Sequence, residues 1–80
     1  MIPISVGGFV KLYRQHNKSL NEQELKASLR RMARLRDRGA RCEICGGSIW
    51  AIGSAVTGWN GCFTCITGES DDSDDYEVCL

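Results

Sequence analysis

Four of the five cysteines form two matching Cys-x-x-Cys pairs, with sixteen residues between the pairs. The first pair is Cys42 and Cys45, and the second is Cys62 and Cys65. Cysteines at this spacing can place both thiolates on one cation, and two pairs complete a closed tetrahedral site of four thiolates. Gly46 follows the first pair and permits a tight turn around sulfur. The pattern therefore predicts one structural Zn²⁺.

Other chemistries of four cysteines fit the sequence less well. An iron site of the rubredoxin type would use the same ligands, but nothing in the chain indicates an electron-transfer surface. A thiol-disulfide exchanger needs a reactive pair near a βαβ unit, and none is expected. A catalytic zinc keeps an open position, which four cysteines do not leave. His16 and Cys79 are expected to have no role as ligands, and we expect the protein not to be an enzyme.

The length of the chain explains why such a site would be needed. A chain of 80 residues buries only about 60% of the surface that it exposes when unfolded, so a small domain commonly needs a metal or disulfides. The first residues do not resemble a secretory signal, and no apolar run is long enough to span a bilayer. We therefore expect a cytoplasmic protein without a membrane partner, where paired cysteines favour metal over disulfides.

The formal net charge of zero conceals two oppositely charged halves. Residues 1–41 hold all ten Lys and Arg and three of the ten acids, which gives +7. Residues 42–80 hold the other seven acids and no Lys or Arg, which gives −7. This polarity indicates a basic surface for nucleic acid or an acidic protein, or two halves that attract each other.

The basic half has the periodicity of two helices. Residues 1–7 are expected to be irregular, and apolar residues at helical spacing predict a first helix over about 8–16. Asn21 and Glu24 resemble a capping box at the start of a second helix, which we expect to end before Gly39.

The second helix is predicted to be amphipathic. At about 100° per residue, Leu25, Leu29 and Met32 form one apolar stripe, in which Arg36 is the only cation. Arginines fill the opposite side. The predicted nucleic-acid-binding residues, called the arginine face below, are Arg30, Arg31, Arg34 and Arg38, with Arg41 just after the helix. The planar guanidinium suits phosphate or carboxylate because it donates two parallel hydrogen bonds.

The remaining sequence predicts a β-hairpin and an acidic tail. Residues 48–59 read as two short alternating segments around Gly53, and they carry Trp50 and Trp59, which are candidate partner-binding residues. The fold class expected is a small α+β protein with two N-terminal helices, a four-cysteine zinc finger with a β-hairpin and a flexible acidic tail. As one folding unit, it divides into a basic helical segment (1–41), the zinc finger (42–66) and the acidic tail (67–80).

The segment "RCEICGGSI", followed by a second cysteine pair, resembles the zinc finger of the DksA/TraR family. The resemblance covers about residues 40–66 and extends to the order of helix before finger. It implies a zinc-ribbon or treble-clef-like site at Cys42, Cys45, Cys62 and Cys65. Small members of that family bind RNA polymerase, but this chain lacks their acidic tip between two long helices, so that function is not carried over.

Three functions are compatible with these features. The first is a zinc-stabilised nucleic-acid-binding regulatory protein that uses the arginine face. The second is a protein-interaction adaptor or inhibitor that acts through the Trp-bearing hairpin and the acidic tail. In the third, the acidic tail covers the arginine face and competes with phosphate.

Overall fold

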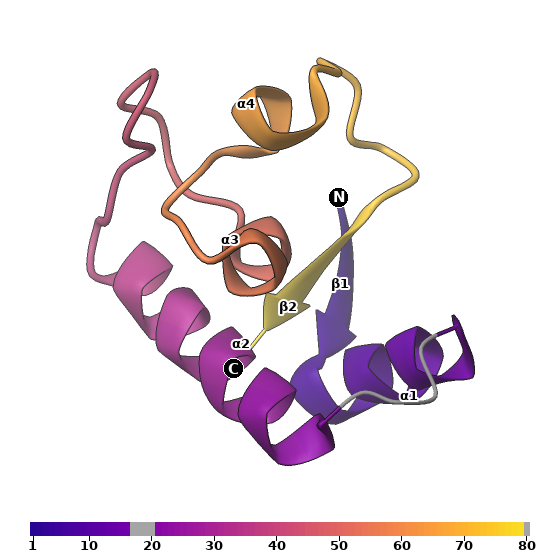
Figure 1. Ribbon diagram of the computed structural model, residues 1–80. Coiled ribbons are helices and arrows are strands. Elements are labelled where there is room, and N and C mark those ends of the chain that lie inside the picture. The colour runs from indigo at the N-terminus through magenta and orange to yellow at the C-terminus, as the bar shows by residue number, and fades with distance from the viewer. Residues whose placement is uncertain (17–20, 80) are drawn as a thin grey trace.

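The computed structural model describes residues 1–16 and 21–79 (Figure 1). In chain order the elements are β1 (Ile2–Ser5), α1 (Val6–His16), α2 (Glu22–Asp37), α3 (Ala51–Thr57), α4 (Phe63–Thr67) and β2 (Tyr76–Cys79). The sequence "HNKS" at 16–19 also predicts a turn between the two helices, and most of it lies outside the described residues. The structure is thus a small α+β fold with a four-cysteine cluster. Cys42 and Cys45 lie between α2 and α3, Cys62 precedes α4, and Cys65 lies within α4.

Local sequence signals account for the two long helices. The Ser5 hydroxyl accepts a hydrogen bond of 3.0 Å from the Gly8 N–H, which satisfies a free donor in the first turn of α1. The Asn21 side chain accepts hydrogen bonds from the N–H groups of Gln23 (3.1 Å) and Glu24 (3.2 Å) at the start of α2. The predicted cap at Asn21 is therefore confirmed, and Gly39 follows the helix with a φ of +92°.

The apolar stripe of α2 faces the centre of the molecule. Leu25, Leu29 and Met32 are buried, and Leu29 is fully inaccessible. The stripe packs against α1 on one side and against α3 on the other. Val78 from β2 is also fully inaccessible and belongs to the same core. The prediction of an inward apolar stripe is confirmed.

The two ends of the chain form a parallel two-stranded sheet, in which Ile2 pairs with Tyr76 and Ile4 with Val78. Two predictions are wrong here. The lead-in at 1–7 contains β1 and the start of α1, and the last residues of the acidic tail form β2. Each segment is too short to show a strand pattern, because its strand exists only by pairing with the distant partner.

Side chains protect the outer edge of β2. The backbone carbonyl of Tyr76 accepts a hydrogen bond of 2.8 Å from the Trp50 indole N–H, and the carbonyl of Val78 accepts one of 2.8 Å from the Arg36 guanidinium. On β1, Pro3 lies between Ile2 and Ile4, and the Ile2 N–H donates to the carbonyl of Asp75, the residue just before β2. Pro3 has no N–H to offer to a further strand, and both edges therefore resist extension.

The predicted β-hairpin at 48–59 is wrong, because residues 51–57 form α3. Its first four residues are buried, and a short buried apolar run has no periodicity that separates strand from helix. Gly58 ends the helix with a φ of +85°, where its N–H donates to the Ser54 carbonyl. The Glu77 carboxylate accepts hydrogen bonds from the N–H groups of Ala51 (2.9 Å) and Ile52 (3.3 Å) and so caps α3 from β2.

None of the helices that the structure describes has both the length and the apolar composition needed to cross a membrane. Figure 1 shows the loop after α2 and the short helix α4 at the end of the molecule away from α1.

Candidate metal centre and arginine face

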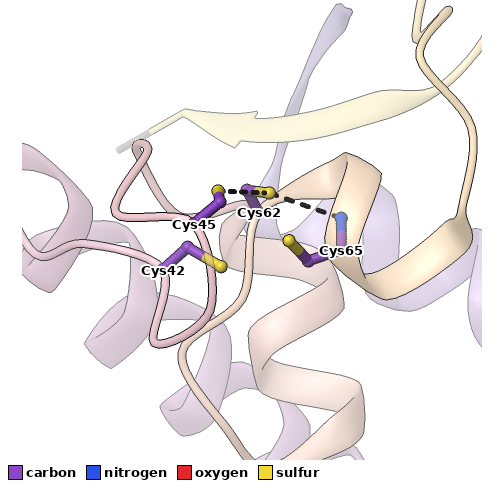
Figure 2. Close-up of side chains that lie close together, drawn as sticks. All are labelled: Cys42, Cys45, Cys62 and Cys65. Carbon is purple, nitrogen blue, oxygen red and sulfur yellow. Dashed lines mark hydrogen bonds between the residues drawn. The ribbon is translucent and has the colours of Figure 1, made fainter.

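The four predicted ligands come together in the folded chain. The sulfur atoms of Cys42, Cys45, Cys62 and Cys65 all lie within 4.8 Å of one another (Figure 2). The sulfurs of Cys45 and Cys62 are 3.4 Å apart. A tetrahedral zinc with bonds of about 2.3 Å separates its sulfurs by about 3.8 Å. The cluster therefore has the size of a site for one metal ion.

The first pair lies on a tight turn after α2. The Cys42 N–H donates to the Gly47 carbonyl (2.7 Å), and the Gly46 N–H donates to the Cys42 carbonyl (3.0 Å). Gly46 has a φ of +75°, which residues with a Cβ rarely adopt. The turn also brings the Gly47 N–H to 3.4 Å from the Cys45 sulfur. The tight turn predicted at Gly46 is thus present, and it directs a backbone donor at one of the four sulfurs.

The second pair lies at the start of α4. Cys62 is the N-cap residue, and its sulfur accepts a hydrogen bond of 3.4 Å from the Cys65 N–H. Free N–H groups at the beginning of a helix favour negatively charged ligands such as thiolates. One pair is thus presented by a turn and the other by the first turn of a helix.

Backbone contacts hold the two pairs in register. The Glu43 N–H donates to the Asn60 carbonyl (2.9 Å), and the Trp50 N–H donates to the Gly61 carbonyl (2.8 Å). The buried Ser54 hydroxyl both donates to the Gly61 carbonyl and accepts from the Gly61 N–H, each at 3.1 Å. A Cβ on Gly61 would lie 2.7 Å from the Trp59 ring, so this close approach requires glycine.

The thiols differ in how readily they ionise. The Cys45 backbone N–H, the largest influence, lowers the pKa of Cys42 to about 6 against the opposing effect of burial. The side chain of Cys62, followed by burial, raises the pKa of Cys65 to about 12. Four thiolates at these distances repel one another, so a cation is needed to hold all of them in the ionised form. Metal binding at neutral pH should therefore release protons.

The chemistry of the donor set fits a structural metal. All five cysteines are free thiols, and Cys79 lies outside the cluster on the exposed surface of β2. A tetrahedral ion bound by four sulfurs has no free position for water or substrate. The four cysteines are therefore placed to bind one metal ion in the manner of a zinc finger.

The arginine face lies on the side of α2 away from the core. The side chains of Arg30, Arg31, Arg34, Arg38 and Arg41 are all exposed. Within residues 1–16 and 21–79, none of these five forms an ion pair or a hydrogen bond through its side chain. The acidic residues of the C-terminal half do not cover this face in the described part of the chain.

Arg36 differs from the arginine face because it has partners. Its guanidinium lies 3.2 Å from the Glu77 carboxylate and 3.0 Å from Asp37, and its side chain is 18% exposed. The pair joins α2 to β2, while Glu77 also caps α3. No local sequence pattern predicted the role of Glu77. The available signal was Arg36 itself, since a cation inside an apolar stripe needs an acidic partner.

The two tryptophans lie in the packed part of the molecule. Trp50 contacts Phe63 edge-to-face with ring centroids 5.0 Å apart, and its indole N–H is bonded to Tyr76. Trp59 is half-buried and packs over Gly61. Neither lies on a hairpin, and both position the backbone that carries the cysteine pairs.

Comparison with protein-family models, curated proteins and solved structures found no match to this chain. The zinc-finger-like character of the site rests on its four cysteines, and no family match supports the resemblance to DksA/TraR.

Proposed function

We propose that this protein is a zinc-stabilised nucleic-acid-binding protein that contacts phosphates through the arginine face of α2. The observation that carries the proposal is that the five exposed arginines of this face have no acidic partner within residues 1–16 and 21–79, in contrast to Arg36. The metal has a structural role in the proposal, and the protein binds rather than catalyses.

Zinc is the metal that the four cysteines favour. Soft thiolate ligands in a tetrahedral arrangement select zinc, or iron as the main alternative. The metal content of protein purified from cells grown with both metals tests this choice. We expect one zinc per chain and no visible absorbance from iron-thiolate bonds, whereas one iron per chain would contradict the zinc assignment.

The arginine face has the dimensions of a phosphate-binding surface. Arg30 lies in α2 and Arg38 is the C-cap residue eight positions later, which corresponds to about 12 Å along the helix axis. Successive nucleotides rise by about 3.4 Å along one strand of DNA, so the face extends over three to four of them. Guanidinium groups without protein partners are free to donate bidentate hydrogen bonds to phosphates.

The contacts of the acidic half leave the arginine face uncovered. Glu77 is engaged with Arg36 on the inner side of α2, which leaves the outer face open. The hypothesis that the acidic tail covers the arginine face therefore receives no support from the contacts of the described residues. The adaptor hypothesis loses one of its two predicted surfaces, because the Trp-bearing hairpin does not form, and it keeps only the acidic tail.

Salt dependence provides the test. Fluorescence anisotropy of the metal-loaded protein with a DNA duplex and with single-stranded RNA should show affinity that falls with salt. Five phosphate contacts predict a slope of log K against log salt of about −4.5 for duplex DNA and about −3.5 for a single strand. The R30Q/R34Q variant should reduce the slope by about 2.

A matched variant separates the arginine face from overall charge. Lys11→Gln with Arg14→Gln removes the same two charges from α1, where Arg14 already pairs with Glu22 at 2.7 Å. For this variant, the slope of log K against log salt should change by less than half the change expected for R30Q/R34Q. Equal losses in both variants, or affinity independent of salt, would contradict the proposal. A partner captured through α2 that survives nuclease treatment would identify an acidic protein surface instead.

A further inference from the structure

An apolar groove of about 400 Å³ opens between α1, α3, α4 and the start of β2. Four aromatic side chains line it, namely Phe9, Tyr13, Trp50 and Tyr76. The volume lies within the range of about 300–1,000 Å³ that is typical of small-molecule sites. No member of the arginine face lines the groove, so it is a separate feature of the molecule.

The rest of the lining is mostly aliphatic. Ile52 and Val56 come from α3, and Ile66 comes from α4. Val56 is 47% exposed and Tyr76 is 38% exposed, which leaves large apolar side chains in contact with water at the mouth. A ligand with an apolar body would remove this surface from water and gain the corresponding free energy.

The polar groups of the lining discriminate between ligands. The Trp50 indole N–H donates to the Tyr76 carbonyl, the Thr57 hydroxyl to the Gly53 carbonyl (2.7 Å), and the Thr67 hydroxyl to the Phe63 carbonyl (2.8 Å). These three donors are therefore occupied. The described lining also contains no Lys or Arg. An anionic ligand would lose its hydration there without a cation to replace it.

Asp75 gives the groove its charge. It is the one charged side chain among the described lining residues, it is half-buried, and in the described structure its carboxylate has no ion pair or hydrogen bond. Exposed acids precede it in the chain at Glu69, Asp71 and Asp74, whereas Asp72 lies 3.5 Å from the N-terminal ammonium. A free acceptor in a negative field favours a cation with N–H donors.

We propose that this groove binds a small organic amine, with an aromatic or branched apolar body and a single ammonium group. The body fills the space between the aromatic and aliphatic side chains, and the ammonium pairs with Asp75. Aromatic faces attract cations in addition, so the same lining serves both parts of the ligand. A free small molecule fits better than a protein segment, because three helices and a strand surround a space of small-molecule size.

Three probes with one apolar body test the charge preference: 3-phenylpropylamine, 3-phenylpropan-1-ol and 3-phenylpropanoate. Each is titrated into the metal-loaded protein and followed by amide shifts in two-dimensional NMR. We expect the amine to bind about fivefold or more tightly than the alcohol. The carboxylate should bind more weakly than the alcohol, and the largest shifts should occur at Ile52, Val56 and Tyr76.

Two pairs of variants test the assignment to residues. Asp75→Asn should abolish the preference for the amine over the alcohol, whereas Asp74→Asn, which removes the same charge from an exposed neighbour outside the lining, should preserve it. Val56→Trp should fill the groove and prevent binding of both probes, whereas Val56→Thr should allow it.

The proposal is overturned by equal affinities for the amine and the alcohol, by an unchanged preference in Asp75→Asn, by shifts that map elsewhere, or by the lack of saturable binding at millimolar concentrations. None of these measurements involves nucleic acid. Their outcome is therefore independent of the function proposed for the arginine face.

Discussion

The two ends of the molecule are stabilised by different interactions. Around α1, α2 and β2, the core consists of apolar side chains such as Leu29 and Val78, which are fully inaccessible. At the cysteine cluster, Ile44 is 70% exposed and Cys45 is also exposed, so few apolar contacts hold the turn. The helical end is thus stabilised by burial, whereas the turn at the cysteine end has few apolar contacts and its four cysteines are placed to be held by a metal ion.

Removal of the metal should cause the largest loss of stability, and the loss should fall on the cysteine end. Structural zinc contributes an apparent free energy of about 10 kcal/mol or more, comparable to the stability of a whole small domain. We expect a chelator or Cys62→Ser to abolish slow amide exchange over residues 42–65 first, as measured by hydrogen exchange with NMR. Cys79→Ser is the matched control and should retain one metal per chain. Unchanged protection after chelation would contradict a stabilising metal.

Substitution of a core residue should lower the stability of the helical end. Leu29→Ala removes a fully buried side chain and should lower the free energy of unfolding by about 2–5 kcal/mol. Denaturant unfolding of the metal-loaded protein measures this loss. The folded fraction should still bind one metal per chain, because Leu29 lies outside the cysteine cluster. Leu12→Ala, at an exposed position of α1, should cost much less.

The pair of Arg36 and Glu77 joins α2 to β2 within the helical end, and its loss should have an intermediate effect. Glu77→Gln keeps an acceptor for the N-terminus of α3 but leaves Arg36 without this partner. We expect a loss of about 1–2 kcal/mol, less than for a fully buried pair, because the two side chains are 18% and 17% exposed. Glu69→Gln removes an exposed charge and serves as the control in thermal unfolding. Equal stability of both variants would show that the ion pair contributes nothing.

The smallest effect is expected at the cap of α2. Asn21→Ala leaves the N–H groups of Gln23 and Glu24 without their side-chain acceptor, at a cost of about 1 kcal/mol. Asn21→Asp retains an acceptor and should be nearly neutral. Chemical denaturation resolves the difference, and a stable Asn21→Ala variant would indicate that tertiary contacts alone fix the start of the helix.

Sequence patterns predicted those features that depend on neighbours in the chain. Asn21 and Glu24 marked the start of α2, the spacing of Leu25, Leu29 and Met32 marked its buried side, and the four cysteines marked the metal site. The sequence did not reveal β1, β2 or the cap that Glu77 provides for α3. These features depend on contacts between residues far apart in the chain, which local periodicity does not encode.

The segment predicted as a hairpin illustrates the same limit. Residues 51–54 are buried, so no alternation of polar and apolar residues marks their conformation. Gly58 and the carboxylate of Glu77 favour the helix at its two ends, and only Gly58 is local in sequence. The nucleic-acid-binding role of the arginine face was also predicted from sequence, and it remains a proposal.

The pairing of β1 with β2 has a consequence for chain entropy. Ile2 and Tyr76 are 74 positions apart, and closing a loop of that length costs about 4 kcal/mol in the unfolded chain. A metal that joins Cys42 to Cys65 before the sheet forms would shorten the effective loop by 23 residues, which lowers this cost by only about 0.3 kcal/mol. Early metal binding therefore leaves most of the entropic barrier to sheet formation in place, and the favourable free energy that closes the sheet must come from the burial of Val78 and the contacts of Glu77.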